Sequence, residues 1–162
     1  MRLRLNSKLE LLENEAFDPL LIDYSEGYEN SQAYSETFKA HMASVLELLK
    51  KHMPKDTRIL VSPAKRAQQT ASALELPFTT LPELAPGASP QVLLNLANWD
   101  TSKGSVLIMG HQPSLGMAAA IAMTRKTHYW CVKKGAIWWV ASRVRAEEEQ
   151  AIIRAVITPD LL

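Results

Sequence analysis

Residues 58–71 have the sequence Arg-Ile-Leu-Val-Ser-Pro-Ala-Lys-Arg-Ala-Gln-Gln-Thr-Ala. The aliphatic run at 58–61 is typical of a short buried strand. Ser62-Pro63 interrupts the run, and residues 64–76 have the pattern of a helix with a proline at or near its first turn. The segment therefore predicts a buried strand that breaks sharply into a helix, the repeating unit of layered α/β domains.

A second unit of the same kind lies further along the chain. Residues 105–115 have the sequence Ser-Val-Leu-Ile-Met-Gly-His-Gln-Pro-Ser-Leu. We expect a buried strand at 105–109, a tight turn at Gly110, and a helix over 115–123 that Ser114 caps. Ligands of such sheets bind beyond the carboxyl ends of the strands. The candidate residues are therefore those that follow Leu5, Val61 and Met109.

The remaining elements follow the same alternation of strands and helices. An opening strand is expected near residues 2–5, a helix at 7–15, and a longer helix that Ser35 caps and that ends before Pro54. Further expected elements are a short exposed strand in 77–84, a helix from Ser89 to about Asn98, and strands at 129–132, 136–143 and 152–157. This order predicts an α/β fold.

The composition restricts the class of protein. A chain of 162 residues has the size of a single domain, expected here over residues 1–162. With 47% hydrophobic and 22% charged residues, a disordered, collagen-like or coiled-coil protein is excluded. No apolar run approaches the roughly 18 residues of a membrane span. A net charge of +1 argues against a nucleic-acid-binding surface.

The N-terminal sequence and the cysteine content indicate the cellular compartment. No signal peptide pattern follows Arg2 and Arg4, so we expect a cytoplasmic protein. The one cysteine, Cys131, forms no internal disulfide and no cysteine-rich metal site, and is expected to be a small buried side chain. No metal and no cofactor is predicted, and the oligomeric state is left open.

Arg66 and His111 are the residues whose chemistry suits these positions. An arginine in the first turn of a helix can direct its guanidinium toward an anion at the helix N-terminus, where it binds a phosphoryl group through paired hydrogen bonds. A histidine at a strand end can donate to an anion or transfer a proton. The alternatives are a solvated Arg66 on a surface helix and a His111 that fills a turn and bonds a carbonyl.

Together the two segments resemble the histidine phosphatase superfamily. Ser-Pro-x-x-Arg-Ala-x-Gln-Thr-Ala after one strand and Gly-His-x-Pro-x-Leu after a later one are similar to its motifs. The chain length, residues 83–88 and Lys134-Gly135-Ala136 resemble the small bacterial phosphohistidine phosphatases, the SixA group. The resemblance implies a three-layer α/β/α sandwich around a largely parallel sheet. It also implies a pocket in which Arg66 and His111 bind a phosphoryl group.

The chain departs from that family at its first strand. There the family has Arg-His-Gly or Arg-His-Ala, whose histidine takes the phosphoryl group. Aligning residues 1–5 with that strand puts Ser7 in the arginine position and Lys8 in the histidine position, and no Arg-His pair occurs anywhere in the sequence. Residues 9–34 also lack the family's Arg-Pro-Leu-Thr-like stretch.

Neither residue replaces the nucleophile easily. Deprotonating a free lysine such as Lys8 at pH 7 costs about 4.6 kcal/mol, and Ser7 needs a base, for which His111 is the candidate. Removing a nucleophile can cost on the order of 10⁶ in rate, about 8 kcal/mol. Lys8 and Ser7 can still help to bind phosphate.

Three hypotheses follow from these observations. The first is a degenerate phosphohistidine phosphatase-like protein that binds a phosphorylated protein or a small phosphate ligand without hydrolysing it. The second is an active phosphatase with a replacement nucleophile, or one whose catalytic segment is missing from this sequence. The third is a non-catalytic interaction domain.

Two further expectations concern single residues. Glu83 is interpreted as a solvated loop carboxylate; the alternative is an acid that protonates the leaving group. Of Trp138 and Trp139, one is expected in the core and one partly exposed.

Overall fold

The computed structural model describes residues 3–6, 11–14, 35–99, 104–145 and 148–159. In chain order the elements are β1 (Leu3–Asn6), β2 (Leu11–Asn14), α1 (Glu36–His52), β3 (Arg58–Val61), α2 (Lys65–Ser72), β4 (Thr79–Thr80), the 3-10 helix η2 (Pro82–Leu84), α3 (Pro90–Ala97), β5 (Val106–Met109), α4 (Ser114–Thr124), β6 (Ile137–Arg145) and β7 (Glu148–Ile157). Within the described residues, no helix is both long and apolar enough to cross a membrane.

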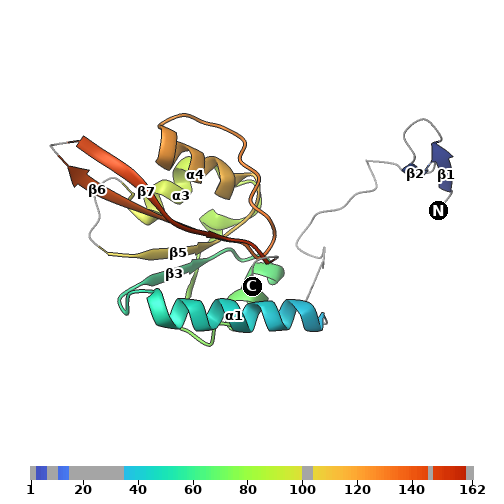
Figure 1. The fold of residues 1–162 in the computed structure, drawn as a ribbon, viewed down its shortest axis with the longest axis horizontal. Coiled ribbons are helices and arrows are strands. Elements are labelled where there is room, and N and C mark those ends of the chain that lie inside the picture. Colours follow the sequence, from blue (N-terminus) through green and yellow to red (C-terminus); the bar gives the residue numbers. More distant parts are fainter. Residues whose placement is uncertain (1–2, 7–10, 15–34, 100–103, 146–147, 160–162) are drawn as a thin grey trace.

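A parallel sheet lies at the centre of the fold, with β3 between β4 and β5. β3 and β5 pair in register, so that Arg58 lies opposite Val106 and Val61 opposite Met109. The two strands therefore end at the same level, and the helices that follow them start from one edge of the sheet (Figure 1). The predicted α/β fold with a parallel sheet is confirmed.

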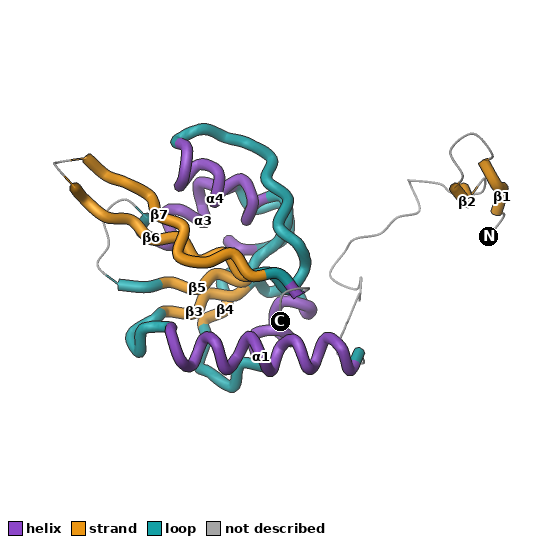
Figure 2. Tube along the Cα trace, viewed as in Figure 1, coloured by secondary structure: helices purple, strands orange, loops and turns teal. Residues whose placement is uncertain are grey.

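Helices cover both faces of this sheet because its strands carry apolar side chains on both sides. Ile59 and Val61 point toward one face, where Val61 is fully buried and both pack with Ala67 and Ala71 of α2. Leu60 points to the other face and packs with α3 and α4. α1 covers the first face through Met42, Val45 and Leu49, in contact with Leu107 and Met109 of β5. Figure 2 shows the resulting order of helix, sheet and helix.

α1 begins and ends as its sequence predicts. The Ser35 hydroxyl accepts a hydrogen bond from the Phe38 N–H at 3.3 Å, which makes Ser35 the N-cap. Lys50, Lys51 and His52 lie in the last turn, where cations interact favourably with the helix dipole.

The C-terminal strands form a separate antiparallel hairpin, with a bulge between Trp139 and Val140 of β6. Ile137 at its start packs against the α1 cluster. Nearby, Nε2 of the buried His41 donates to the Gly135 carbonyl at 2.9 Å, which joins α1 to the turn before β6. Trp138 and Trp139 are both half-buried, so the expectation of one core tryptophan is wrong. Each has its own ring contact: Trp138 packs on Trp130, and Trp139 lies under Arg154.

The N-terminal expectations are corrected in two respects. The helix expected over 7–15 is wrong at residues 11–14, which form strand β2 antiparallel to β1. Pairing between the two strands satisfies their backbone groups and overrides the helical spacing of the leucines. The opening strand exists, but it belongs to this two-stranded sheet and not to the parallel sheet.

Smaller corrections concern the segments beside the core. Residues 129–132 form no strand; Tyr129 is 79% exposed and Cys131 is exposed, not buried. α2 ends at Ser72, short of the expected residue 76, and residues 77–84 divide into a two-residue strand and η2. Ser114 is not the cap of α4: Pro113 holds that position, and the Ser114 hydroxyl donates to the Ala88 carbonyl instead.

The contact between α4 and the segment before β6 gives a test of this packing. A Cβ added at Gly116 would overlap the Trp130 carbonyl oxygen, whereas a Cβ added at Gly110 would make an ordinary contact with the Leu115 side chain at 3.7 Å. We expect Gly116→Ala to lower the free energy of unfolding by about 1–3 kcal/mol or more, because backbone must move. Urea denaturation followed by circular dichroism measures this, with Gly110→Ala as the control. Equal stability of the two variants contradicts the close approach.

Candidate functional site

The register of β3 with β5 brings two turns together. Val61 and Met109 are opposite each other, and the Ser62 N–H continues the ladder by donating to the Met109 carbonyl at 2.9 Å. Ser62 and His111 therefore emerge side by side at the carboxyl ends of their strands, where ligands bind in parallel sheets. Arg66 follows on α2, one turn beyond Ser62.

His111 makes one hydrogen bond with each of its ring nitrogens. Its Nδ1 lies 3.0 Å from Nη2 of Arg66, and its Nε2 lies 2.8 Å from the Ser62 hydroxyl oxygen. A guanidinium group only donates, so Nδ1 accepts and carries no proton. The proton of the neutral ring is therefore on Nε2, which donates to Ser62. We assign this tautomer from the direction of the hydrogen bonds.

The environment keeps His111 neutral. Ser62 is completely buried and His111 is 9% exposed. Burial, followed by the positive charge of Arg66, lowers the pKa of His111 from 6.5 to about 4. At neutral pH the positive charge of the pair therefore resides on Arg66 alone.

Neighbouring groups hold Ser62 and Arg66 in place. The Ser62 hydroxyl also accepts from the Ala64 N–H at 3.2 Å, and the Gln68 side-chain amide donates to the Ser62 carbonyl. The Thr70 hydroxyl donates to the Arg66 carbonyl at 3.0 Å, one turn along α2. The Gln112 amide donates to the Val132 carbonyl at 3.3 Å and ties the His111 turn to the segment before β6.

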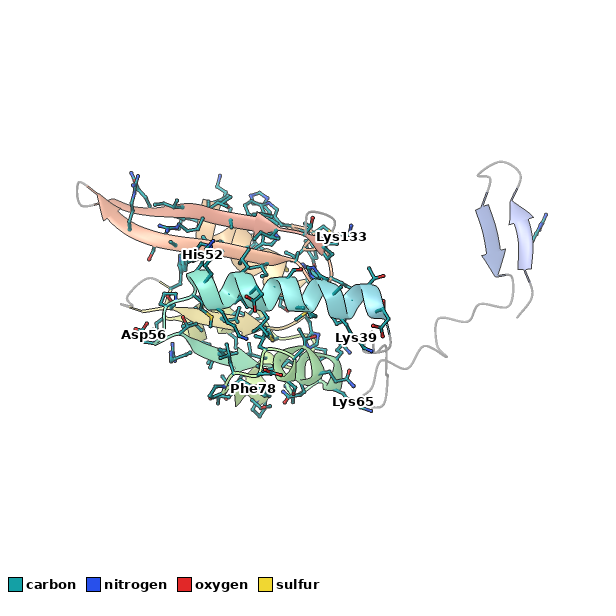
Figure 3. The ribbon with its side chains drawn as sticks, turned by 60° about the horizontal axis from the view of Figure 1, so that its bottom comes forward. Lys39, His52, Asp56, Lys65, Phe78 and Lys133 are labelled. Atoms are coloured by element: carbon teal, nitrogen blue, oxygen red, sulfur yellow. The ribbon has the colours of Figure 1, made fainter. Side chains whose placement is uncertain are left out.

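This arrangement suits an oxyanion better than a cation. Arg66 is half-buried and keeps N–H donors besides the one directed at His111. Figure 3 shows Lys65 and Lys133 at the same end of the molecule, where β3 and β5 end. Among the described residues, no three His, Cys, Asp or Glu side chains gather as a metal site requires.

The structure brings together two of the predicted site residues, Arg66 and His111. Ser7 and Lys8 lie outside the described residues, so their placement stays a prediction. Glu83 is exposed on η2, in keeping with a solvated carboxylate. Sequence analysis included Ser62 among the residues that follow a buried strand but assigned it no role, because its contact with His111 depends on the tertiary structure.

Comparison with solved structures gives matches along most of the chain. One is the protein histidine phosphatase SixA complexed with tungstate, at 26% identity and a TM-score of 0.57, with 75% of this chain and 81% of that chain covered. A second match, SixA from Nakamurella multipartitia, has 15% identity and a TM-score of 0.55, with 77% of this chain and 83% of that chain covered. A third, from Agrobacterium tumefaciens, has 26% identity and a TM-score of 0.44, with 53% and 58% covered. No family model and no curated protein matches the sequence.

The lowered pKa of His111 predicts how stability depends on pH. In the unfolded protein the His111 ring takes up a proton near pH 6.5, and in the folded protein only near pH 4. The free energy of unfolding is therefore unaffected by this ring above pH 6.5 and falls as the pH drops from 6.5 toward 4. We expect a loss of up to about 3 kcal/mol, at about 1.4 kcal/mol for each pKa unit. Urea unfolding at pH 7.5 and pH 4.5 measures it. His111→Gln lacks the titrating ring and should lose less; an equal loss in both proteins contradicts the prediction.

Proposed function

We propose that this chain, a SixA-like member of the histidine phosphatase superfamily, binds a phosphoryl group without hydrolysing it. The observation that carries the proposal is the contact between Arg66 and His111, which come from separate turns and meet at one edge of the parallel sheet. The other half of the proposal, the loss of phosphatase activity, rests on the sequence around the first strand.

Three features support binding. The Arg66 guanidinium can grip two phosphoryl oxygens through charge-assisted hydrogen bonds. His111 lies beside it, and its Nδ1 can supply a further donor when it carries a proton in place of the present contact. The similar SixA structure was obtained with tungstate, a tetrahedral oxyanion of the same shape and charge class as phosphate.

The absence of an activated nucleophile supports inactivity. The sequence has no Arg-His pair, and the family's nucleophile position aligns with Lys8, whose ammonium has no lone pair. Ser62 is not a substitute nucleophile, because its hydroxyl accepts a hydrogen bond from His111 Nε2 and is fully buried. A serine nucleophile needs a base that accepts its proton, the opposite polarity.

The ligand class follows from the same chemistry. A phosphorylated protein, or a small phosphate compound, offers the terminal oxygens that Arg66 would grip; Ser7 and Lys8 are proposed to add to this binding. Three parts of this proposal rest on the sequence: the contribution of Ser7 and Lys8 to binding, the placement of the whole chain in a single domain, and the cytoplasmic location.

Anion binding is the first experiment. We expect inorganic phosphate to raise the melting temperature of the protein in a dose-dependent manner, since a ligand of the folded state stabilises it. Arg66→Ala should weaken phosphate binding by at least about tenfold, through loss of a charge-assisted pair. Lys50→Ala removes an exposed cation from the last turn of α1, away from the site, and is the control. If phosphate has no effect on the wild type, the interaction-domain hypothesis is favoured instead.

Turnover is the second experiment. We expect no hydrolysis of a phosphohistidine peptide or of a generic phosphate ester above the background rate, because the histidine nucleophile is absent. Release of inorganic phosphate from both substrates is measured for the wild type and for His111→Ala. Robust turnover that disappears in His111→Ala defeats the inactive interpretation and establishes a replacement nucleophile.

A further inference from the structure

Ser62 is a buried polar group for which the proposed function has no role. It is completely buried, and its hydroxyl contacts the ring nitrogen of His111 that faces away from Arg66. The hydroxyl accepts from His111 Nε2–H at 2.8 Å and from the Ala64 N–H at 3.2 Å. Both lone pairs of the hydroxyl oxygen thus accept hydrogen bonds, and the direction of the hydroxyl proton is left to be assigned.

The His111 ring, as it stands, presents the wrong atom to an anion. Its Nδ1 faces Arg66 as a bare acceptor, and a lone pair repels a phosphoryl oxygen that binds to the same guanidinium. To donate to the anion, Nδ1 must carry a proton. Either the ring takes up a second proton, or the existing proton leaves Nε2 while another arrives at Nδ1.

The hydroxyl of Ser62 makes the second route possible. If the Ser62 O–H rotates toward Nε2 it becomes the donor of the same hydrogen bond, and Nε2 is satisfied without a proton. The bond from the Ala64 N–H is unaffected, because the hydroxyl oxygen keeps a lone pair for it. The Nε2 proton is released to water and one proton from water is taken up at Nδ1, so neither the charge of His111 nor the number of bound protons changes.

We propose that Ser62 is a positioning residue that accommodates both tautomers of His111: its hydroxyl accepts from Nε2 in the free protein, where Arg66 keeps Nδ1 bare, and donates to Nε2 when an oxyanion binds to Arg66 and Nδ1 carries the proton. Only the second part of this proposal, the change of tautomer when an oxyanion binds, rests on the proposed phosphoryl-binding function. Ser62 is not a nucleophile in this scheme, because it touches the ring on the side away from Arg66. The burial of His111, which lowers its pKa, opposes the route through a doubly protonated ring.

The free protein tests the first half. Nitrogen-15 NMR of the histidine rings separates protonated from bare ring nitrogens, and the His111 signals are those absent from His111→Gln. We expect Nε2 of wild-type His111 to be protonated and Nδ1 bare at pH 7.5, and Ser62→Ala to change the Nε2 signal. A wild-type ring with its proton on Nδ1 overturns the proposal, whether or not the protein binds phosphate.

Tungstate, a dianion that does not titrate near neutral pH, tests the second half. We expect the His111 proton to move to Nδ1 on addition of tungstate, and calorimetry in two buffers of different ionisation enthalpy to show no net proton uptake. Ser62→Ala should bind tungstate about five- to tenfold more weakly, with uptake of close to one proton. Proton uptake by the wild type, or unchanged binding by Ser62→Ala, overturns the proposal.

Two controls separate this role from a structural one. Ser114→Ala removes another buried serine hydroxyl, which donates to the Ala88 carbonyl and not to His111, and should leave tungstate binding unchanged. Ser62→Thr keeps the hydroxyl and should restore binding without proton uptake, provided that its melting temperature shows it to be folded. If wild-type protein does not bind tungstate, the phosphoryl-binding function fails, and the tautomer in the free protein still decides the role of Ser62.

Discussion

The parallel pairing of β3 with β5 is the constraint on which the site depends. Because Val61 lies opposite Met109, the residues that follow the two strands leave the sheet at the same level. The bond from the Ser62 N–H to the Met109 carbonyl extends this register by one step. Helices packed on both faces bury the strands and fix the register, since a slip by one residue moves every apolar side chain to the other face. The position of Arg66 beside His111 is a consequence of that packing.

The direction of the hydrogen bonds at His111 sets what the site can do. Arg66 donates to one side of the ring, and the ring donates to Ser62 on the other. In an arrangement that activates a serine, by contrast, the ring accepts from the hydroxyl and its other nitrogen donates to a carboxylate. Here a cation stands where the carboxylate stands in that arrangement. The site therefore carries a positive charge suited to an anion and a histidine that is neutral at physiological pH.

The relation to the histidine phosphatases is uneven along the chain. The two strand ends that carry Arg66 and His111 keep the family pattern, and the fold matches that of SixA. The first strand lacks the Arg-His pair, and in the structure β1 pairs with β2 and not with the parallel sheet. On the proposed function, phosphoryl binding and catalysis would be carried by different parts of the sequence. A pocket can lose its nucleophile and keep its electrostatic attraction, because the two properties depend on separate segments.

The sequence alone determined the elements with strong local patterns. The aliphatic runs that end at Ser62-Pro63 and Gly110 predicted β3 and β5, and Ser35 predicted the start of α1. The meeting of Arg66 with His111 was expected only from the resemblance to a family, since spacing left a solvated arginine as an alternative. The tertiary structure decided the exposure of Cys131, the strand at residues 11–14 and the contact of Ser62 with His111. Local periodicity says which face of an element is apolar, but burial and hydrogen-bond direction depend on partners such as Ser62 and His111, which lie 49 residues apart.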